Sequence, residues 1–300
     1  SPLRRRTRAP CEDGEDECVE GWMACHLTLE QIKELRVRQP DACRSQDYNL
    51  LYEVPTFAET CEFVRRMVDG EKAHALVGTG MTKSEWLDHR NRYTLKFGRC
   101  RPNPSVGLYV ETKRPGWYRS VGLPLEEKLV EAVDASGFEG PVIVQSFEAD
   151  SLRRMRDLKP EWKTVKLLTR GDVDRAASDD DENGGGLDRM MEGFASLGID
   201  GIGPDKAAVL ANPISPPESS PLVEAAHSHG LVVHPYTFKS DVAHLHRCYG
   251  GNASQEFAQF FRLGVDGVFA DFPGHAVFAR ELFNRLRLQG SDLLLFSDMA

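Results

Sequence analysis

From residue 106 onward the chain alternates between short β-rich runs and helix-like stretches, and this alternation constrains the fold more than any other feature. The helix-like stretches fill most of the gaps and end at Gly137, Pro160 and Gly230. Alternating strands and helices indicate parallel βα units, and nearly continuous apolar strands are typical of a buried parallel sheet. The pattern predicts six strands, over residues 106–112, 141–146, 164–168, 199–203, 230–236 and 265–270.

Polar side chains recur where these predicted strands end. In the first run, GLYVETKRPGWY, alternation of side chains puts Glu111 and Lys113 on one face and Thr112 on the other, apolar face. Barrels and doubly wound sheets place catalytic and ligand groups at the carboxyl ends of their strands. We therefore expect a pocket at this edge. The polar residues there are Glu111, Lys113, Gln145, Ser146, Asp205, His234, Tyr236 and Asp271, the last of them more typical of a structural loop residue.

The first hundred residues lack this regularity. Helices are expected over residues 27–39, where Thr28 and Gln31 have the spacing of a capping box, and over residues 54–70. The predicted organisation is a loop or disordered start over 1–26, one domain over 27–285 with an insertion at about 71–104, and a C-terminal tail over 286–300.

Composition excludes some classes of function. The net charge of −9 argues against a nucleic-acid-binding protein, because such proteins usually carry a basic face. No apolar run reaches the roughly 18 residues that a membrane-spanning helix requires. The seven cysteines have no CxxC spacing, so they permit up to three disulfides or none, and their crowding in the first hundred residues slightly favours an oxidising compartment. The oligomeric state stays open.

Other candidate sites are weaker. The acidic run SDDDENGGGLDR at 178–189 is more typical of a flexible loop than of a calcium loop, because it lacks the glutamate at position 12 of an EF-hand. His244 and His246 have no third zinc ligand at a suitable spacing. They are interpreted, like His227 and His229, as surface or loop residues, and Cys248 as an unreactive thiol.

Several segments in a fixed order resemble the glycerophosphodiester phosphodiesterase family, and its periplasmic type in particular. They are GLYVETKRP, VIVQSFEADSLRRMRDLKP, DGIGPD, LVVHPYTFKSD and GVDGVFADFP. Upstream, LTLEQIKELR and EVPTFAETCEF resemble the segment before the family's Glu-x-Lys strand. The resemblance covers most of residues 27–280.

The resemblance implies an α/β fold of the (β/α)8 TIM-barrel type, of which this chain would hold six of eight strands. It implies hydrolysis of small-molecule glycerophosphodiesters to glycerol 3-phosphate and an alcohol, with a divalent metal, calcium or magnesium. Such a cation neutralises the phosphate, while an acid and a base move protons between the oxygens. The family type favours a secreted, periplasmic or organellar-lumen location.

The resemblance also implies roles for particular residues. Glu111 matches the third metal carboxylate of the family, and Lys113 matches the lysine beside it, which can pair with phosphate. Gln145, His234 and Tyr236 match segments at the pocket edge and are expected to bind substrate, while Phe147 lies beside them in QSF and Phe238 lies where many relatives carry tryptophan. The alternative for Glu111 is a solvated strand-end carboxylate, and for the other polar residues a side chain that only satisfies backbone groups.

Three motifs of the family are missing from these 300 residues: its His-Arg-Gly strand, its Glu-x-Asp strand and its His-Asp pair. In the family they supply both catalytic histidines and two of the three metal carboxylates. The start SPLRRRTRAP resembles the sequence just after the His-Asp pair, so the catalytic histidines are expected upstream of Ser1. We therefore expect no measurable hydrolysis from this chain alone.

Two alternatives stay open. One is a non-catalytic remnant that binds a phosphodiester or a protein partner. The other is the activity of the related barrel phospholipases D, which share the metal and histidine chemistry; the segments HPYTFKSD and DGIGPD favour the diesterase.

Overall fold

The computed structural model of the chain describes residues 7–8, 20–21, 23–68, 106–179, 185–215 and 217–288. The chain divides into two compact units: unit 1 is Ser1–Val110 with Pro115–Ile143, and unit 2 is Glu111–Arg114 with Val144–Ala300. The expected single domain stays a prediction. The expected insertion at 71–104 lies outside the described residues, as does most of the expected tail.

Unit 1 begins with short elements. Strands β1 (Thr7–Arg8) and β2 (Glu20–Gly21) pair antiparallel within the segment expected to be a loop or disordered, and η1 (Ala24–His26) is a 3-10 helix. Helix α1 (Leu29–Glu34) has the predicted capping box: the Thr28 hydroxyl accepts from the Gln31 N–H, and the Gln31 side chain accepts from the Thr28 N–H. It ends before the predicted boundary because Arg36 pairs with Glu53 in an antiparallel bridge.

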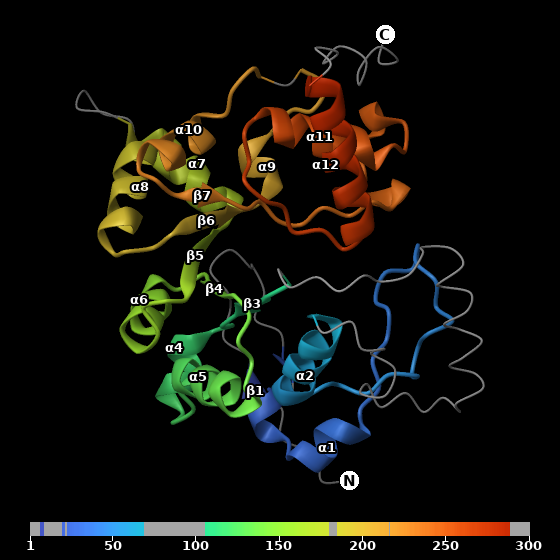
Figure 1. The fold of residues 1–300 in the computed structure, drawn as a ribbon, viewed down its shortest axis with the longest axis vertical. Coiled ribbons are helices and arrows are strands. Elements are labelled where there is room, and N and C mark those ends of the chain that lie inside the picture. Colours follow the sequence, from blue (N-terminus) through green and yellow to red (C-terminus); the bar gives the residue numbers. More distant parts are fainter. Residues whose placement is uncertain are drawn as a thin grey trace. The chain divides into compact units, whose positions relative to one another are not determined.

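The core of unit 1 lies between α2 (Phe57–Val68) and α5 (Leu125–Ser136), which pack together (Figure 1). Cys61 on α2 is fully buried, and burial raises the pKa of its thiol. Helix α4 (Pro115–Ser120) precedes α5, and Arg119 at its end pairs with the fully buried carboxylate of Glu126 at 2.5 Å. Helix α5 ends at Gly137, as the sequence predicts.

The predicted parallel strands form one five-stranded sheet. Its order is β3 (Leu108–Glu111), β4 (Val142–Ser146), β5 (Lys163–Leu168), β6 (Gly201–Pro204) and β7 (Val232–Val233). Strands β5 to β7 pair in parallel register, and the bonds from Leu108 N–H to the Pro141 carbonyl and from Thr112 N–H to the Gln145 carbonyl keep β3 parallel to β4. An α/β fold with a parallel sheet is therefore confirmed, while the closed barrel stays a prediction.

The expected sixth strand is not formed as a regular strand. Residues 265–270 run beside the end of β7, but only Phe238 and Ala270 form a bridge, which is isolated and parallel. Strand β7 itself has two residues where 230–236 was expected. Pro235 explains part of this shortening, since it has no N–H to donate to a ladder.

Helices cover one face of the sheet in unit 2. Leu168 of β5, Ile202 of β6 and Val233 of β7 are buried in a core that also contains side chains of the helices near these strands. The helices are α6 (Ala149–Leu158), α7 (Arg170–Ser178), α8 (Gly186–Ser196), α9 (Lys206–Val209), α10 (Pro221–Ser228), α11 (Ala253–Arg262) and α12 (Pro273–Leu288), with 3-10 turns η2 (Val242–His244) and η3 (Arg247–Tyr249).

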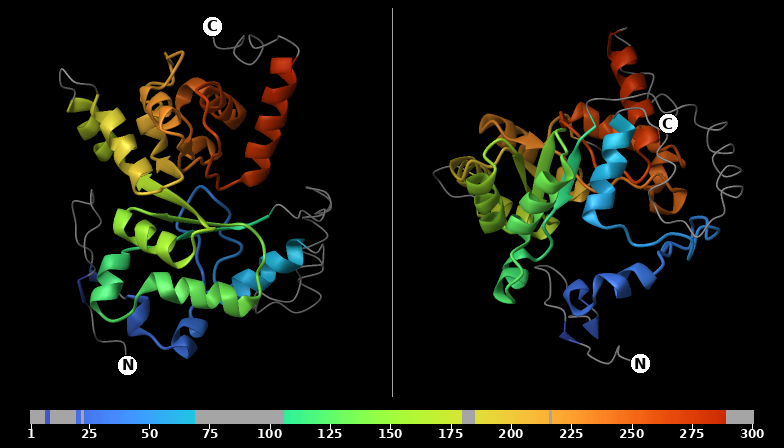
Figure 2. Two further views of the ribbon diagram at one scale, coloured as in Figure 1. Left: turned by 60° about the vertical axis from the view of Figure 1, so that its left-hand side comes forward. Right: turned by 60° about the horizontal axis from the view of Figure 1, so that its bottom comes forward.

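Two of these helices change the predicted boundaries. Helix α8 includes residues 186–189 of the expected loop at 178–189, while residues 180–184 lie outside the described part of the chain. Helix α12, the long red helix of Figure 2, packs along α11 and includes residues 286–288 of the expected tail. None of the helices described is both long and apolar enough for a bilayer crossing.

Candidate functional site

The predicted site residues of unit 2 share one face of the sheet. Ile202 and Val233 point into the helix-covered core, so the alternation of side chains sends His234, one position further on, to the opposite face. On β3 and β4, Glu111 and Gln145 likewise alternate with the buried side chains of Thr112 and Ser146. Alternation thus puts Glu111, Gln145 and His234 on the face away from the helices, and their role as a shared site stays a prediction.

Glu111 is the last residue of β3, and Lys113 follows two positions later on the same face. The Lys113 ammonium lies 3.3 Å from the Glu111 carboxylate, with 66% of the lysine side chain and 22% of the glutamate side chain exposed. An exposed pair of this kind contributes little to stability. Its geometry therefore leaves both charges accessible to a small ligand.

Gln145 on β4 holds a polar atom without a protein partner. Its side-chain oxygen Oε1 is buried and accepts no hydrogen bond from the residues that the structure describes. A buried acceptor without a donor costs about 1–3 kcal/mol, so such groups are rare in stable folds unless a ligand completes them. Among the predicted substrate residues, Gln145 is the one whose side chain most needs an outside partner.

Tyr236 and Phe147 form an aromatic corner. Their rings meet edge to face, with centroids 6.2 Å apart. The Tyr236 hydroxyl donates to the Leu168 carbonyl at 3.1 Å, so it satisfies a backbone group at the end of β5. This contact positions the ring rather than the hydroxyl for a ligand.

The His234 ring lies against a glycine. A side chain at Gly267 would come within 2.9 Å of the imidazole Cδ2. Burial lowers the pKa of His234 below its ordinary value of 6.5, and the carboxylate of Asp266 opposes this with a smaller effect. The imidazole is therefore neutral near pH 7 and is suited to hydrogen bonding rather than to carrying a charge.

Other strand-end residues have structural duties. The Asp205 carboxylate caps α9 by accepting from the Ala207 N–H at 2.7 Å, and Asp271 is exposed. Phe238 is fully buried and stacks on Phe257 with ring centroids 5.0 Å apart, so it belongs to the core and not to a substrate wall.

The histidines outside this face also have neighbours. His227 pairs with Asp266 and His229 with Asp188, each at 2.9 Å. The partners are 39 and 41 residues apart in the chain, so the sequence alone does not predict these pairs. The His246 ring lies 3.0 Å from the sulfur of Cys248, whose thiol pKa is raised, chiefly by burial. A raised pKa agrees with the expectation of an unreactive thiol.

The polar residues at this edge supply the type of ligand atom that a hard divalent cation prefers. Glu111 supplies a carboxylate and Gln145 an orphaned amide oxygen, and oxygen donors are what Ca²⁺ and Mg²⁺ select. Calcium takes about six to eight oxygens, so these two would have to be joined by further ligands.

Sequence reasoning missed the group that holds this edge together. Thr112 hydrogen-bonds Ser151 of α6 through its hydroxyl and Ser146 of β4 through its carbonyl. The one signal was a hydroxyl on the otherwise apolar face of the first strand. Lys166 was missed as well; its ammonium donates to the Phe147 carbonyl at 2.8 Å and to the Leu167 carbonyl at 2.7 Å.

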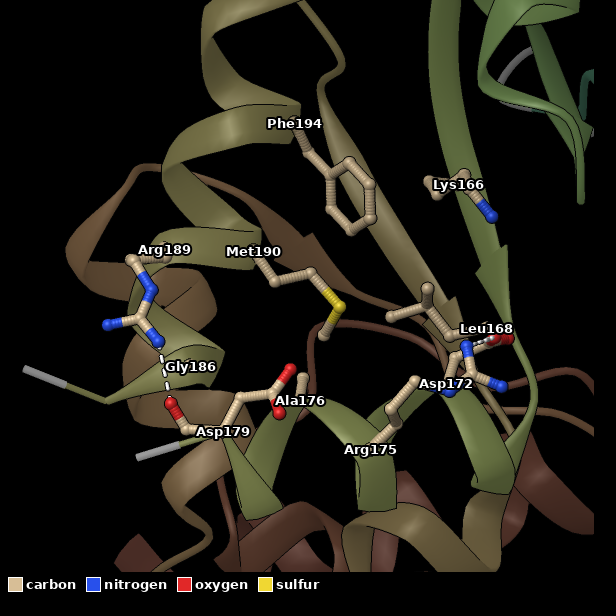
Figure 3. Close-up of a pocket in the computed structure, with 10 residues that line it drawn as sticks. All are labelled: Lys166, Leu168, Asp172, Arg175, Ala176, Asp179, Gly186, Arg189, Met190 and Phe194. Atoms are coloured by element: carbon tan, nitrogen blue, oxygen red, sulfur yellow. Dashed lines mark hydrogen bonds and ion pairs between the residues drawn. The ribbon is translucent and has the colours of Figure 1, made fainter. Parts of the chain in front are cut away.

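A cavity of about 360 Å³ lies elsewhere in unit 2, between β5, α7 and α8 (Figure 3). Phe194 and Met190 of α8 face Leu168 of β5 across it. Its charged side chains have partners: Arg189 donates to the Asp179 carbonyl, and Arg175 lies 3.6 Å from the Asp172 carboxylate. No predicted site residue lines this cavity.

Comparison with known proteins gives the same family as the sequence motifs. Residues 13–275 match the glycerophosphoryl diester phosphodiesterase family. A glycerophosphodiester phosphodiesterase of Arabidopsis thaliana is 25% identical over 275 residues, which are 85% of this chain and 63% of the relative. One of Bacillus subtilis is 29% identical over 174 residues, 56% of this chain and 47% of the relative. The chain thus spans about half to two thirds of the length of these curated relatives.

Solved structures of such proteins are also similar to this chain. A glycerophosphoryl diester phosphodiesterase from Parabacteroides distasonis is 12% identical, with a TM-score of 0.46, over 89% of this chain and 66% of that one. The family match covers far more than half of the 300 residues and includes every strand of the sheet. The chain belongs to the glycerophosphoryl diester phosphodiesterase family.

Proposed function

We propose that this chain takes part in the divalent-metal-dependent hydrolysis of glycerophosphodiesters to glycerol 3-phosphate and an alcohol. Glu111 is the metal ligand, Lys113 pairs with the phosphate, and Gln145, His234 and Tyr236 contact the substrate. The observation that carries the proposal is the unpartnered oxygen of Gln145, on the same face and edge as the accessible Glu111 and Lys113. Family membership supports the substrate class.

Each residue has a chemical task in this proposal. A bound divalent cation would neutralise phosphate charge. The Lys113 ammonium compensates further charge on the phosphate oxygens, and its exposure lets it swing from Glu111 to the ligand. The neutral His234 and the amide of Gln145 orient substrate oxygens by hydrogen bonds. The Tyr236 ring, held by Leu168 and Phe147, walls one side of the site.

The test is hydrolysis of glycerophosphocholine by the protein isolated from its own source, with Ca²⁺, with Mg²⁺ or with a chelator. The expected result is activity that the chelator abolishes and that Glu111→Gln reduces by about 100-fold or more, since loss of a group that only supports a metal ligand already costs about 10–100-fold. Glu161→Gln, at an exposed glutamate of unit 2, is the matched control and should leave the activity unchanged. Full activity in Glu111→Gln would overturn the proposal.

A second candidate is a non-catalytic protein that binds a phosphodiester or a partner. It is favoured by the absence from these 300 residues of His-Arg-Gly and His-Asp sequences and of a Glu-x-Asp strand, since Glu148 and Asp150 lie at the start of helix α6. Losing an acid or a base in proton transfer typically costs 10²–10⁴-fold each. The intact mass of the native polypeptide separates the candidates: a mass well above 33.5 kDa, with peptides that contain these motifs, supports the hydrolase.

A further inference from the structure

The strand end that carries Glu111 and Lys113 is fixed by the residue between them. Thr112 is 4% exposed, and its backbone N–H donates to the Gln145 carbonyl at 3.0 Å. Its own carbonyl accepts from the Ser146 hydroxyl at 3.1 Å. Its hydroxyl lies 3.0 Å from that of Ser151. Every hydrogen-bonding group of Thr112 is therefore bound, by neighbours from β4 and α6.

The partners of Thr112 are themselves held firmly. Ser146 and Ser151 are both fully buried. The Ser146 hydroxyl also accepts from the Glu148 N–H at 3.2 Å, which ties the end of β4 to the start of α6. Removal of one partner of a buried hydrogen bond lowers stability more than removal of one partner of an exposed bond, because the remaining group cannot form a hydrogen bond to water.

This group joins two residues of the proposed site. Glu111 precedes Thr112, and Gln145 supplies both the carbonyl that Thr112 binds and the unpartnered side-chain oxygen on the site face. A shift of the strand end along β4 would therefore change the spacing between the Glu111 carboxylate and the Gln145 amide. Groups behind a metal ligand commonly set its orientation in this way.

We propose that Thr112, through Ser146 and Ser151, is a positioning residue that holds Glu111 and Gln145 in register for the metal and the substrate. The inference rests on the proposed function. Thr112 touches neither ligand; it acts through the backbone of its own strand and of β4. A purely structural threonine would affect stability alone, and this difference makes the proposal testable.

The experiment uses the protein isolated from its own source, as in the hydrolysis test, and Mn²⁺ as the probe, with paramagnetic broadening of the NMR signals of Glu111 and Lys113 as the readout. Thr112→Val removes the hydroxyl and keeps the β-branch. We expect it to weaken Mn²⁺ binding by about 10-fold, the scale seen when a group that supports a metal ligand is removed. Thr112→Ser, which keeps the hydroxyl, should restore most of the affinity.

Thr164→Val is the matched control. Thr164 is 2% exposed on β5, and its hydroxyl donates to Asp200 at 3.3 Å, at the other end of the sheet. It should lower stability while leaving Mn²⁺ affinity at Glu111 unchanged. Urea denaturation of each variant, alongside the titration, separates loss of fold from loss of position.

The outcomes separate the two proposals. If Glu111→Gln abolishes the broadening while Thr112→Val binds Mn²⁺ as the unaltered chain does, the positioning role fails and the metal site stands. Equal weakening by Thr112→Val and Thr164→Val also overturns the positioning role. If the unaltered protein from its own source shows no broadening at Glu111, the proposed metal site fails and the positioning role fails with it.

Discussion

The two ends of the sheet in unit 2 treat their carboxylates in opposite ways. At the amino end, Asp200 accepts from the Lys163 ammonium at 2.8 Å, from the Arg156 guanidinium at 3.2 Å and from the Thr164 N–H at 2.9 Å. At the carboxyl end, the Glu111 carboxylate lies 3.3 Å from the ammonium of Lys113, an exposed lysine. The amino end uses its charge to join strands and helices, whereas the carboxyl end keeps its charge available.

This difference separates stability from binding. Saturated polar groups hold a fold in place, because each hydrogen bond to a charged group contributes about 1.5–3 kcal/mol. Polar groups without a hydrogen-bond partner, such as the Gln145 oxygen, weaken the fold but can accept a hydrogen bond from a ligand or coordinate a metal ion. In barrels and related sheets the same division is general, with ligand sites at the carboxyl ends of the strands.

The largest expected effect on stability is at Asp200. Asp200→Asn keeps the shape of the side chain but removes the charge that Lys163 and Arg156 share. We expect the free energy of unfolding to fall by about 2 kcal/mol, the scale of a charged hydrogen bond. Urea denaturation measures it, with Asp157→Asn, at an exposed site on α6, as the control. A fall no larger than that of the control would contradict the comparison.

The fall in the free energy of unfolding at acid pH should depend on the same carboxylate, that of Asp200. Burial acts to raise the pKa of Asp200, but the bonds from Lys163 and the Thr164 N–H outweigh it and hold the pKa below 3.8. The unfolded chain then binds the proton more tightly, so the contribution is full above pH 3.8 and is lost as the pH falls through the lower folded value. Asp200→Asn should reduce this fall in urea titrations at several pH values. Parallel curves for the two proteins would refute the assignment.

At Gln145 the expected sign is reversed. Gln145→Leu removes a buried oxygen without a partner, so the free energy of unfolding should stay level or rise by up to about 1 kcal/mol. Binding of glycerophosphocholine, followed by calorimetry, should weaken in the same variant, because the Gln145 amide is proposed to orient substrate oxygens. A loss of more than about 1 kcal/mol would mean that the oxygen has a partner in the folded chain.

The smallest effect on stability is expected at Lys113. Lys113→Met should change the free energy of unfolding by only a few tenths of a kcal/mol, because an exposed ion pair contributes about 0.2–1 kcal/mol. Binding of inorganic phosphate, followed by calorimetry, should nevertheless weaken, and the difference from the unaltered chain should shrink as salt is added. A difference that persists at high salt would indicate that Lys113 acts by shape and not by charge.

The sequence predicts the strands well because their signal is local. Five of the six expected runs became β3 to β7, and the face shared by Glu111 and Lys113 follows from simple alternation. Helix α8 was missed because its glycine-rich start is typical of a loop. Gly186 is needed there for packing, since any side chain would meet the carbonyl of Ala176 on α7.

The polar contacts of the site are the part that sequence could not supply. Thr112 and Ser151 are 39 residues apart, and their contact depends on the register between β3 and β4 and on where α6 begins. A one-residue change of register would turn Thr112 to the other face. The spacing of residues along the chain does not determine that register. The Thr112 contacts and the unpartnered Gln145 oxygen could therefore not be predicted from the sequence.

The close approach of His234 to Gly267 offers a handle for engineering. The imidazole occupies the space that one methyl group at position 267 would fill. Gly267→Ala would thus displace a polar group of the site by a small step while every polar residue keeps its identity. Alteration of the proposed site could begin from a position that has no side chain at all.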